Sequence, residues 1–159
     1  MSAAAGDVPE VPRAPMPRQR SKPLLPIRGV VSLIDRNEDA VLALIEQGQI
    51  AWAWDVSLDG KRARSKELRV LPAAVANYMT GRPCTLEWAD VLGMLIPADA
   101  RTLATPEVSR LLNASHTHVF ALGGRKLLRH CSSWRTGPGG AARFSTESVV
   151  NFLRNRRFP

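Results

Sequence analysis

The sequence predicts a mainly α-helical fold with small β-hairpin wings, organised as tandem helix-turn-helix modules that a helical linker joins. Three observations support this fold class. Apolar residues recur at helical spacing in short segments that begin at capping residues and end at turn residues. Short alternating segments around glycine- and proline-containing turns are typical of hairpins. The same order of apolar, cap and turn positions then occurs a second time along the chain.

The predicted organisation is a tail, two modules and a linker. Residues 1–26 hold six prolines among scattered Arg and Lys, and this composition buries too little apolar area to offset the entropy of ordering. We therefore expect a disordered Pro/Arg-rich tail, whose cations either touch a phosphate backbone or stay solvated. The first module covers 27–81, the helical linker 82–104, and the second, basic module 105–159.

Three helices are predicted in the first module. The first begins at Ile27 and breaks at Asp35. Asn37 caps the second helix, which Gly48 ends, and Pro72 opens the third. The first two helices form a helix-turn-helix.

A hairpin lies between the second and third of these helices. Residues 50–56 alternate as a strand with Trp52 and Trp54 on one face, residues 58–61 form a turn, and residues 67–71 return as a strand. We expect the tryptophans to pack within the module rather than to stack on bases.

The second module repeats this order. Thr105 caps a helix whose first position is Pro106, and Asn113 breaks it. Ser115 caps the next helix, which ends at Gly123 and the glycine after it. The apolar positions at helical spacing are Val108, Leu111 and Leu112 in one helix and Val119, Phe120 and Leu122 in the other.

A hairpin wing and a closing helix complete the second module. An alternating segment leads to a Gly/Pro tip at 136–140, and residues 142–144 form the returning strand. The closing helix begins at the cap formed by Ser145 and Thr146.

The linker contains one short amphipathic helix. Thr85 is its expected cap. Its apolar stripe consists of Leu86, Val91, Leu92 and Leu95. We expect a structural connector that packs on one or both modules, and a dimer contact is the alternative.

Equivalent positions of the two modules show an internal repeat. At a spacing of 78 residues, the matched pairs are Leu33 and Leu111, Asn37 and Ser115, Val41 and Val119, and Leu44 and Leu122. In the last helix the spacing is 74 residues, and the matched pairs are Val75 and Val149, Tyr78 and Phe152, and Met79 and Leu153. The difference falls in the wing, where loop length varies at little cost.

Charge is distributed unequally between the modules. The net charge is +8, with a pI near 10.7. Residues 105–159 hold nine Lys/Arg against two acids, whereas residues 1–104 hold 13 basic and 12 acidic groups. Almost all of the attraction for a polyanion such as nucleic acid therefore belongs to the second module.

The second helix-turn-helix is the predicted DNA-binding site. A helix fits the major groove with its first side chains on base edges, while flanking cations neutralise phosphates. The leading positions are Ser115, His116, Thr117 and His118. The expected phosphate or minor-groove contacts are Arg125, Lys126, Arg129, Arg135 and Arg143, with the wing tip close to the backbone.

The first module carries different groups at the same positions. Glu38 and Asp39 would be repelled by phosphates, although a carboxylate can accept a hydrogen bond from cytosine. Its wing holds a dense basic run that includes Lys61, Arg62 and Arg64. Phosphate contact and a solvated charged hairpin are both compatible with that run.

Other classes of site have little support in the sequence. His116 and His118 are two positions apart, so on a helix they point to different sides and form no metal site. Phosphate-cradling loops, zinc-protease motifs and nucleophile elbows are missing, and we expect no enzyme and no cofactor. Cys84 and Cys131 are expected to be reduced. The chain has no membrane-spanning run or signal-type leader, which predicts a cytoplasmic, nucleoid-associated protein.

The segment TPEVSRLLNASHTHVFAL, followed by a hairpin and FSTESVVNFLRNRRF, resembles the excisionase and MerR-like winged helix-turn-helix family. The segment IRGVVSLIDRNEDAVLALIEQGQI, followed by ELRVLPAAVANYM, looks like a divergent second copy. The resemblance implies that 115–118 belong to a recognition helix and that Arg129, Arg135 and Arg143 are wing contacts. The sequence departs from the family at Ala121, where members often carry a base.

These observations favour a bacterial protein that binds double-stranded DNA sequence-specifically, as a transcriptional regulator or as an excisionase-like recombination accessory factor. The alternative is a non-enzymatic protein-interaction adaptor in a larger nucleoprotein complex. In either case the first module or the linker helix is the expected surface for self-association or for another protein, and no membrane partner is expected.

Overall fold

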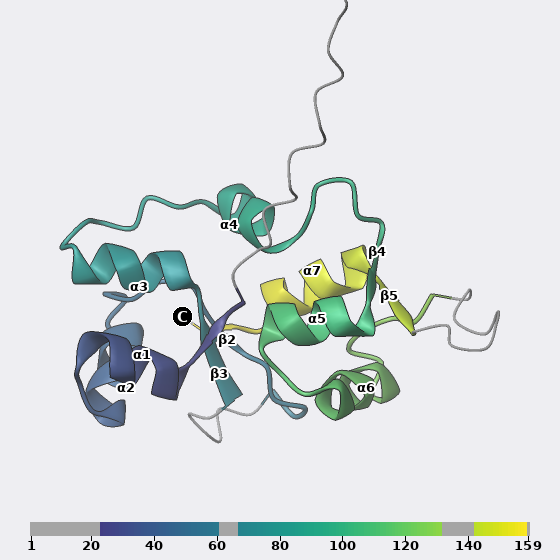
Figure 1. Ribbon diagram of the computed structural model, residues 1–159, viewed down its shortest axis with the longest axis horizontal. Coiled ribbons are helices and arrows are strands. Elements are labelled where there is room, and N and C mark those ends of the chain that lie inside the picture. The colour runs from purple at the N-terminus through teal and green to yellow at the C-terminus, as the bar shows by residue number, and fades with distance from the viewer. Residues whose placement is uncertain (1–22, 61–66, 132–141, 159) are drawn as a thin grey trace, which may run out of the picture.

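Figure 1 shows the computed structural model, which describes residues 23–60, 67–131 and 142–158. Within these residues, seven helices and short antiparallel strands make up the molecule. The expectation of a mainly α-helical fold with small β elements is therefore confirmed. No helix in this part of the chain is long and apolar enough to cross a membrane.

The first copy of the repeat spans residues 25–79. Its elements are β1 (Leu25–Pro26), α1 (Ile27–Ile34), α2 (Glu38–Glu46), β2 (Ala53–Asp55), β3 (Leu68–Val70) and α3 (Pro72–Met79). Asp35 adopts a left-handed conformation that ends α1. Asn37 caps α2 as predicted, because its side-chain oxygen accepts a hydrogen bond from the Ala40 amide at 2.8 Å.

The second copy spans residues 102–155. Its elements are β4 (Thr102–Ala104), α5 (Thr105–Leu112), α6 (His116–Gly124), β5 (Arg143–Ser145) and α7 (Thr146–Asn155). Ser115 is the predicted cap of α6 and accepts a hydrogen bond from the His118 amide at 3.1 Å. The predicted cap at Thr105 is wrong. Thr105 is the first residue of α5, and its buried hydroxyl donates to the carbonyl oxygen of Ala142 at 2.9 Å.

One backbone plan underlies both copies. Helices α5 and α6 begin 78 residues after α1 and α2, and α7 begins 74 residues after α3. The backbone is left-handed at Asp35 and Asn113, between the paired helices, and again at Gly48 and Lys126, after the second helix of each pair. The repeat found in the sequence thus corresponds to equivalent elements and equivalent turns.

The cores of the copies differ at one pair of positions. Val70 in β3 and Phe144 in β5 hold the same register position, and Ile45 in α2 corresponds to Gly123 in α6. A Cβ atom on Gly123 would lie 3.0 Å from the Phe144 ring and 2.6 Å from the His130 ring. The larger ring of Phe144 is therefore accommodated by the loss of a side chain in α6.

The linker helix α4 (Trp88–Leu95) begins after Glu87, so the predicted cap at Thr85 is wrong. The Asp90 carboxylate accepts a hydrogen bond from the Glu87 amide at 2.9 Å, and this local pair fixes the helix start. Trp88 stacks on Trp52 with ring centroids 5.9 Å apart. The linker helix is thus packed against the first copy, above the junction of the two copies in Figure 1.

The copies are joined by strand pairing. The larger sheet has the order β1-β3-β2-β6, and its last strand, β6 (Arg157–Phe158), follows α7 of the second copy. Figure 1 shows this C-terminal segment crossing from α7 into the first copy. At the other edge, the Leu24 amide donates to the carbonyl oxygen of Leu111 at 3.1 Å. A single cluster of buried apolar residues includes both copies and α4.

Two boundaries therefore differ from the sequence-based ones. Leu24 is fully buried and β1 follows it, so residues assigned to the predicted tail belong to the fold. Residues 102–104, which the sequence assigned to the helical linker, form strand β4 and pair with β5 of the second copy. The predicted two-stranded wing of that copy is described only at its base, where His130 forms a single bridge with Phe144.

Candidate nucleic-acid interface

The first turn of α6 presents polar side chains to solvent. Ser115, His116 and Thr117 are exposed, whereas Val119 and Leu122 on the opposite face are fully buried. Burial of that face against α5 and the hydrogen bond of the Ser115 cap fix the direction in which α6 points. Hydroxyl and imidazole groups at a helix N-terminus can donate to or accept from base edges.

His118, one of the predicted DNA contacts, has a partner inside the molecule. Its Nε2 atom lies 2.6 Å from the carbonyl oxygen of Val56, in the first copy. Because a carbonyl oxygen only accepts, Nε2 must carry the hydrogen. His118 therefore ties α6 to the first copy rather than facing outward with His116 and Thr117.

Arg69 makes a second tie between the copies. Its Nε donates to the carbonyl oxygen of Leu112 at 3.0 Å, and its Nη2 donates to that of Asn113 at 3.0 Å. These carbonyls end α5, where the helix dipole favours a cation. Burial lowers the pKa of the Arg69 guanidinium, and the carboxylate of Glu67 opposes that shift. The cation is thus held, partly desolvated, against the turn that precedes α6.

A small open cavity separates α6 from the hairpin of the first copy. It is lined by Val56, Glu67, Arg69, Ala114, Ser115 and His118. Its lining comes from residues next to or within β2 and β3 on one side, and from the turn before α6 and the first turn of α6 on the other. Residues of the first copy therefore lie beside the first turn of α6 in the second copy.

Two exposed cations follow the C-terminal end of α6. Arg125 forms an ion pair with Asp59 of the first copy, with 2.5 Å between Nη1 and Oδ1. Both side chains are more than half exposed, so solvent weakens this pair. Among the described residues, Lys126 has neither an ion-pair nor a hydrogen-bond partner for its ammonium group.

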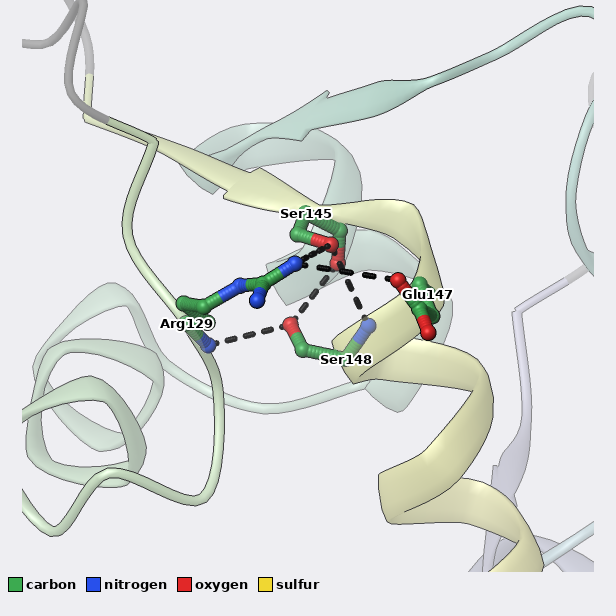
Figure 2. Close-up of polar contacts among 4 residues, drawn as sticks. All are labelled: Arg129, Ser145, Glu147 and Ser148. Atoms are coloured by element: carbon green, nitrogen blue, oxygen red, sulfur yellow. Dashed lines mark hydrogen bonds and ion pairs between the residues drawn. The ribbon is translucent and has the colours of Figure 1, made fainter.

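Arg129 lies over the N-terminus of α7 (Figure 2). Its amide donates to Ser148 Oγ at 3.0 Å, which fixes the backbone. Its guanidinium reaches Ser145 Oγ at 3.4 Å and the carboxylate of Glu147 at 3.7 Å, and the side chain remains 71% exposed. The backbone of Arg129 is thus anchored while its charge is only loosely paired.

Three further cations, Arg143, Arg154 and Arg157, contact other parts of the fold. Arg143 donates from Nε to Thr102 Oγ1 at 2.9 Å, across the smaller sheet. The guanidinium of Arg157 lies 3.8 Å from the Trp52 ring centroid, and that of Arg154 lies 5.7 Å from the centroid of Trp88. A large share of the basic charge thus contacts the fold itself and lies outside the α6 surface.

The first copy presents acids where α6 presents neutral polar groups. Glu38 and Asp39 are exposed in the first turn of α2, at the positions equivalent to His116 and Thr117. Carboxylates there stabilise the positive end of the helix dipole. Stabilisation of the α2 N-terminus is therefore enough to explain why these two acids are present.

Four of the predicted contacts lie outside the described residues, namely Lys61, Arg62, Arg64 and Arg135. The described ends of the first basic segment are Gly60 and Glu67, and Glu67 lines the cavity beside Ser115 and His118.

Histidine and cysteine side chains form no cluster in the part of the chain that the structure describes. No group of three or more His, Cys, Asp or Glu there could hold a metal ion. His130 packs on Phe144 with ring centroids 4.6 Å apart, and Cys84 and Cys131 are free thiols.

Sequence reasoning missed the contacts between the copies and the exposure of Phe120. Arg69 and Asp59 carry no local signal for partners more than 40 positions away. Phe120 was expected on the buried face of α6, yet 49% of its surface is exposed. A helical wheel anchored on Val119 and Leu122 places Phe120 about 130° from the centre of the buried face, so helical periodicity agrees with its exposure and the expectation was wrong.

The chain was also compared with known proteins. No family model, curated protein or solved structure matches it.

Proposed function

We propose that this protein binds double-stranded DNA sequence-specifically through two unequal winged helix-turn-helix copies, as a transcriptional regulator or a recombination accessory factor. The observation that carries the proposal is the surface of α6, where exposed His116 and Thr117 lie on the same helix that Arg125 and Lys126 follow. A single helix of this kind fits the width of the major groove.

The division of labour follows from the chemistry of these groups. Ser115, His116 and Thr117 supply donors and acceptors for base edges, and the exposed cations supply phosphate contacts that release counterions. An exposed ion pair such as that of Arg125 with Asp59 is worth little, so exchanging Asp59 for a phosphate costs little.

The first copy has a supporting role in this proposal. Glu38 and Asp39 on its leading turn are repelled by phosphates, which disfavours base reading by α2. Arg69 and the Val56 carbonyl of the same copy hold the turn and the first residues of α6. The first copy thus orients the helix that enters the groove.

Fluorescence anisotropy with a random-sequence duplex at several salt concentrations tests the proposal. We expect binding that weakens with salt, and a logarithmic salt slope that falls by about 0.9 in Lys126→Gln, because one phosphate contact is lost. Arg82→Gln is the matched control, since Arg82 is exposed and follows α3, and Figure 1 shows helix α3 well separated from helix α6. We expect Arg82→Gln to leave the slope unchanged.

Two results would contradict the proposal. Absence of binding at the lowest salt would favour the protein-interaction adaptor, for which the acidic surface of α2 is the available docking face. Equal slopes for Lys126→Gln and the unmodified protein, together with a changed slope for Arg82→Gln, would place the duplex on another surface.

A further inference from the structure

Phe120 is a large apolar side chain on the exposed face of α6. Its exposed fraction is 49%, although the neighbouring Val119 is fully buried. Phe120 follows His116 by four positions, so the two side chains lie on one face of the helix. With a rise of about 1.5 Å per residue, they are about 6 Å apart along the helix axis. The ring therefore lies beside the groups proposed to contact base edges.

The first copy has no exposed aromatic side chain at the position equivalent to Phe120. Leu42 holds the corresponding place in α2 and is partly buried against the core. The other large exposed apolar side chains of the described residues are Leu33, Met79 and Met94, on α1, α3 and α4. Within this part of the chain, only α6 combines such a side chain with a polar first turn and a cationic end.

This combination matches the major groove of duplex DNA. The groove edge of a T·A pair carries an apolar group, the thymine C5-methyl, and Phe is one of the side chains that contact it. The cations that follow α6, Arg125 and Lys126, complement the phosphates that border the groove.

We infer that Phe120 contacts the C5-methyl group of a thymine and makes α6 select a T·A pair at that position. This inference rests on the proposed function and adds a specific base to it. Phe120 is then a specificity-determining residue, whereas the cations contribute affinity that does not depend on sequence.

The test uses the full chain and duplexes selected from a random-sequence library. Each thymine of the selected sequence is replaced in turn by uracil, which lacks only the methyl group. We expect one uracil substitution to weaken binding about fourfold, the effect of exposing one buried methyl group. In Phe120→Ala, binding to the thymine and uracil duplexes should be equal at that position. Circular dichroism checks that the variant is folded. We expect it to fold, because about half of the Phe120 side chain is exposed in the unmodified protein.

Leu33→Ala is the matched control, because Leu33 is 50% exposed on α1 of the first copy. It should keep the preference for thymine. The inference is overturned if the unmodified protein binds all uracil duplexes equally well, or if Phe120→Ala still discriminates; the proposed function survives both results. Absence of duplex binding at every salt concentration overturns the proposed function and this inference together.

Discussion

Helices α2 and α6 are the same backbone unit with different surfaces. Each has nine residues, a cap whose side chain accepts a hydrogen bond from the backbone, and a left-handed residue soon after its end. On the first turn, α2 exposes Glu38 and Asp39 where α6 exposes His116 and Thr117. The local fold requires the cap and the buried face, and it leaves the leading side chains free to differ. In our proposal, these leading side chains make α6 the helix that contacts base edges and exclude α2 from that role.

The largest expected effect concerns the core that distinguishes the copies. Phe144→Ala should lower the free energy of unfolding by about 3–5 kcal/mol, because a fully buried ring is removed beside Gly123. Urea denaturation followed by circular dichroism measures this change. A loss below about 1 kcal/mol would contradict the packing described for this site.

A double variant sharpens the same comparison. Gly123→Ile with Phe144→Val gives the second copy the pair of side chains found at Ile45 and Val70 in the first. The double variant should be more stable than Gly123→Ile alone, since Phe144→Val removes the ring that the new side chain would meet. Additive losses of stability would show that the two positions do not share space.

Transfer of the acidic turn onto α6 tests the division of labour. His116→Glu with Thr117→Asp should weaken binding to the selected duplex at least tenfold, because two carboxylates then face the phosphates. Anisotropy at fixed salt measures the loss. The matched control, Glu38→Gln with Asp39→Asn, should bind at least as tightly as the unmodified protein. A loss of binding in the control would show that α2 also contacts DNA.

The two register-equivalent arginines should differ in their effect on stability. Arg69→Ala should cost about 1–3 kcal/mol, because the carbonyls of Leu112 and Asn113 lose a partly buried donor. Arg143→Ala, at the exposed edge of the smaller sheet, should cost about 0.5 kcal/mol or less. Thermal unfolding compares the two variants, and equal shifts would contradict the role of Arg69 in joining the copies.

Another expected effect on stability concerns the two helix caps. Asn37→Ala and Ser115→Ala should each cost about 1 kcal/mol, since each removes one side-chain acceptor from a helix N-terminus. In urea denaturation the two losses should be similar. Only Ser115→Ala should also weaken duplex binding. An equal loss of binding for Asn37→Ala would contradict the proposal that α6, and not α2, contacts DNA.

The sequence predicted the features that depend on neighbouring residues. Asn37 and Ser115 are caps as expected, and the breaks near Asp35 and Asn113 are left-handed turns. Caps and turns are encoded within a few positions, so a single sequence reveals them. Thr105 is an exception, because its hydroxyl bonds Ala142, which is 37 positions away.

Contacts between distant segments were beyond such reasoning. Nothing around Arg69 indicates that its guanidinium reaches α5, and nothing around His118 indicates a bond to Val56. These contacts depend on how the copies pack together, and that packing is set by the shared core as a whole. The sequence therefore predicted the polar first turn of α6 and the cations that follow the helix. It did not predict the hydrogen bonds that attach α6 and the turn before it to the first copy.

The pairing of β6 with β2 has a consequence for how the chain folds. Trp54 and its partner Arg157 are 103 positions apart, so this edge of the larger sheet closes only after the second copy has been synthesised. Until then, β2 exposes unpaired amides and carbonyls, the kind of edge that promotes aggregation. Contacts of such large sequence separation slow folding, because a long loop must close before they form. During translation the nascent first copy thus lacks one strand of its sheet and is a candidate client for chaperones.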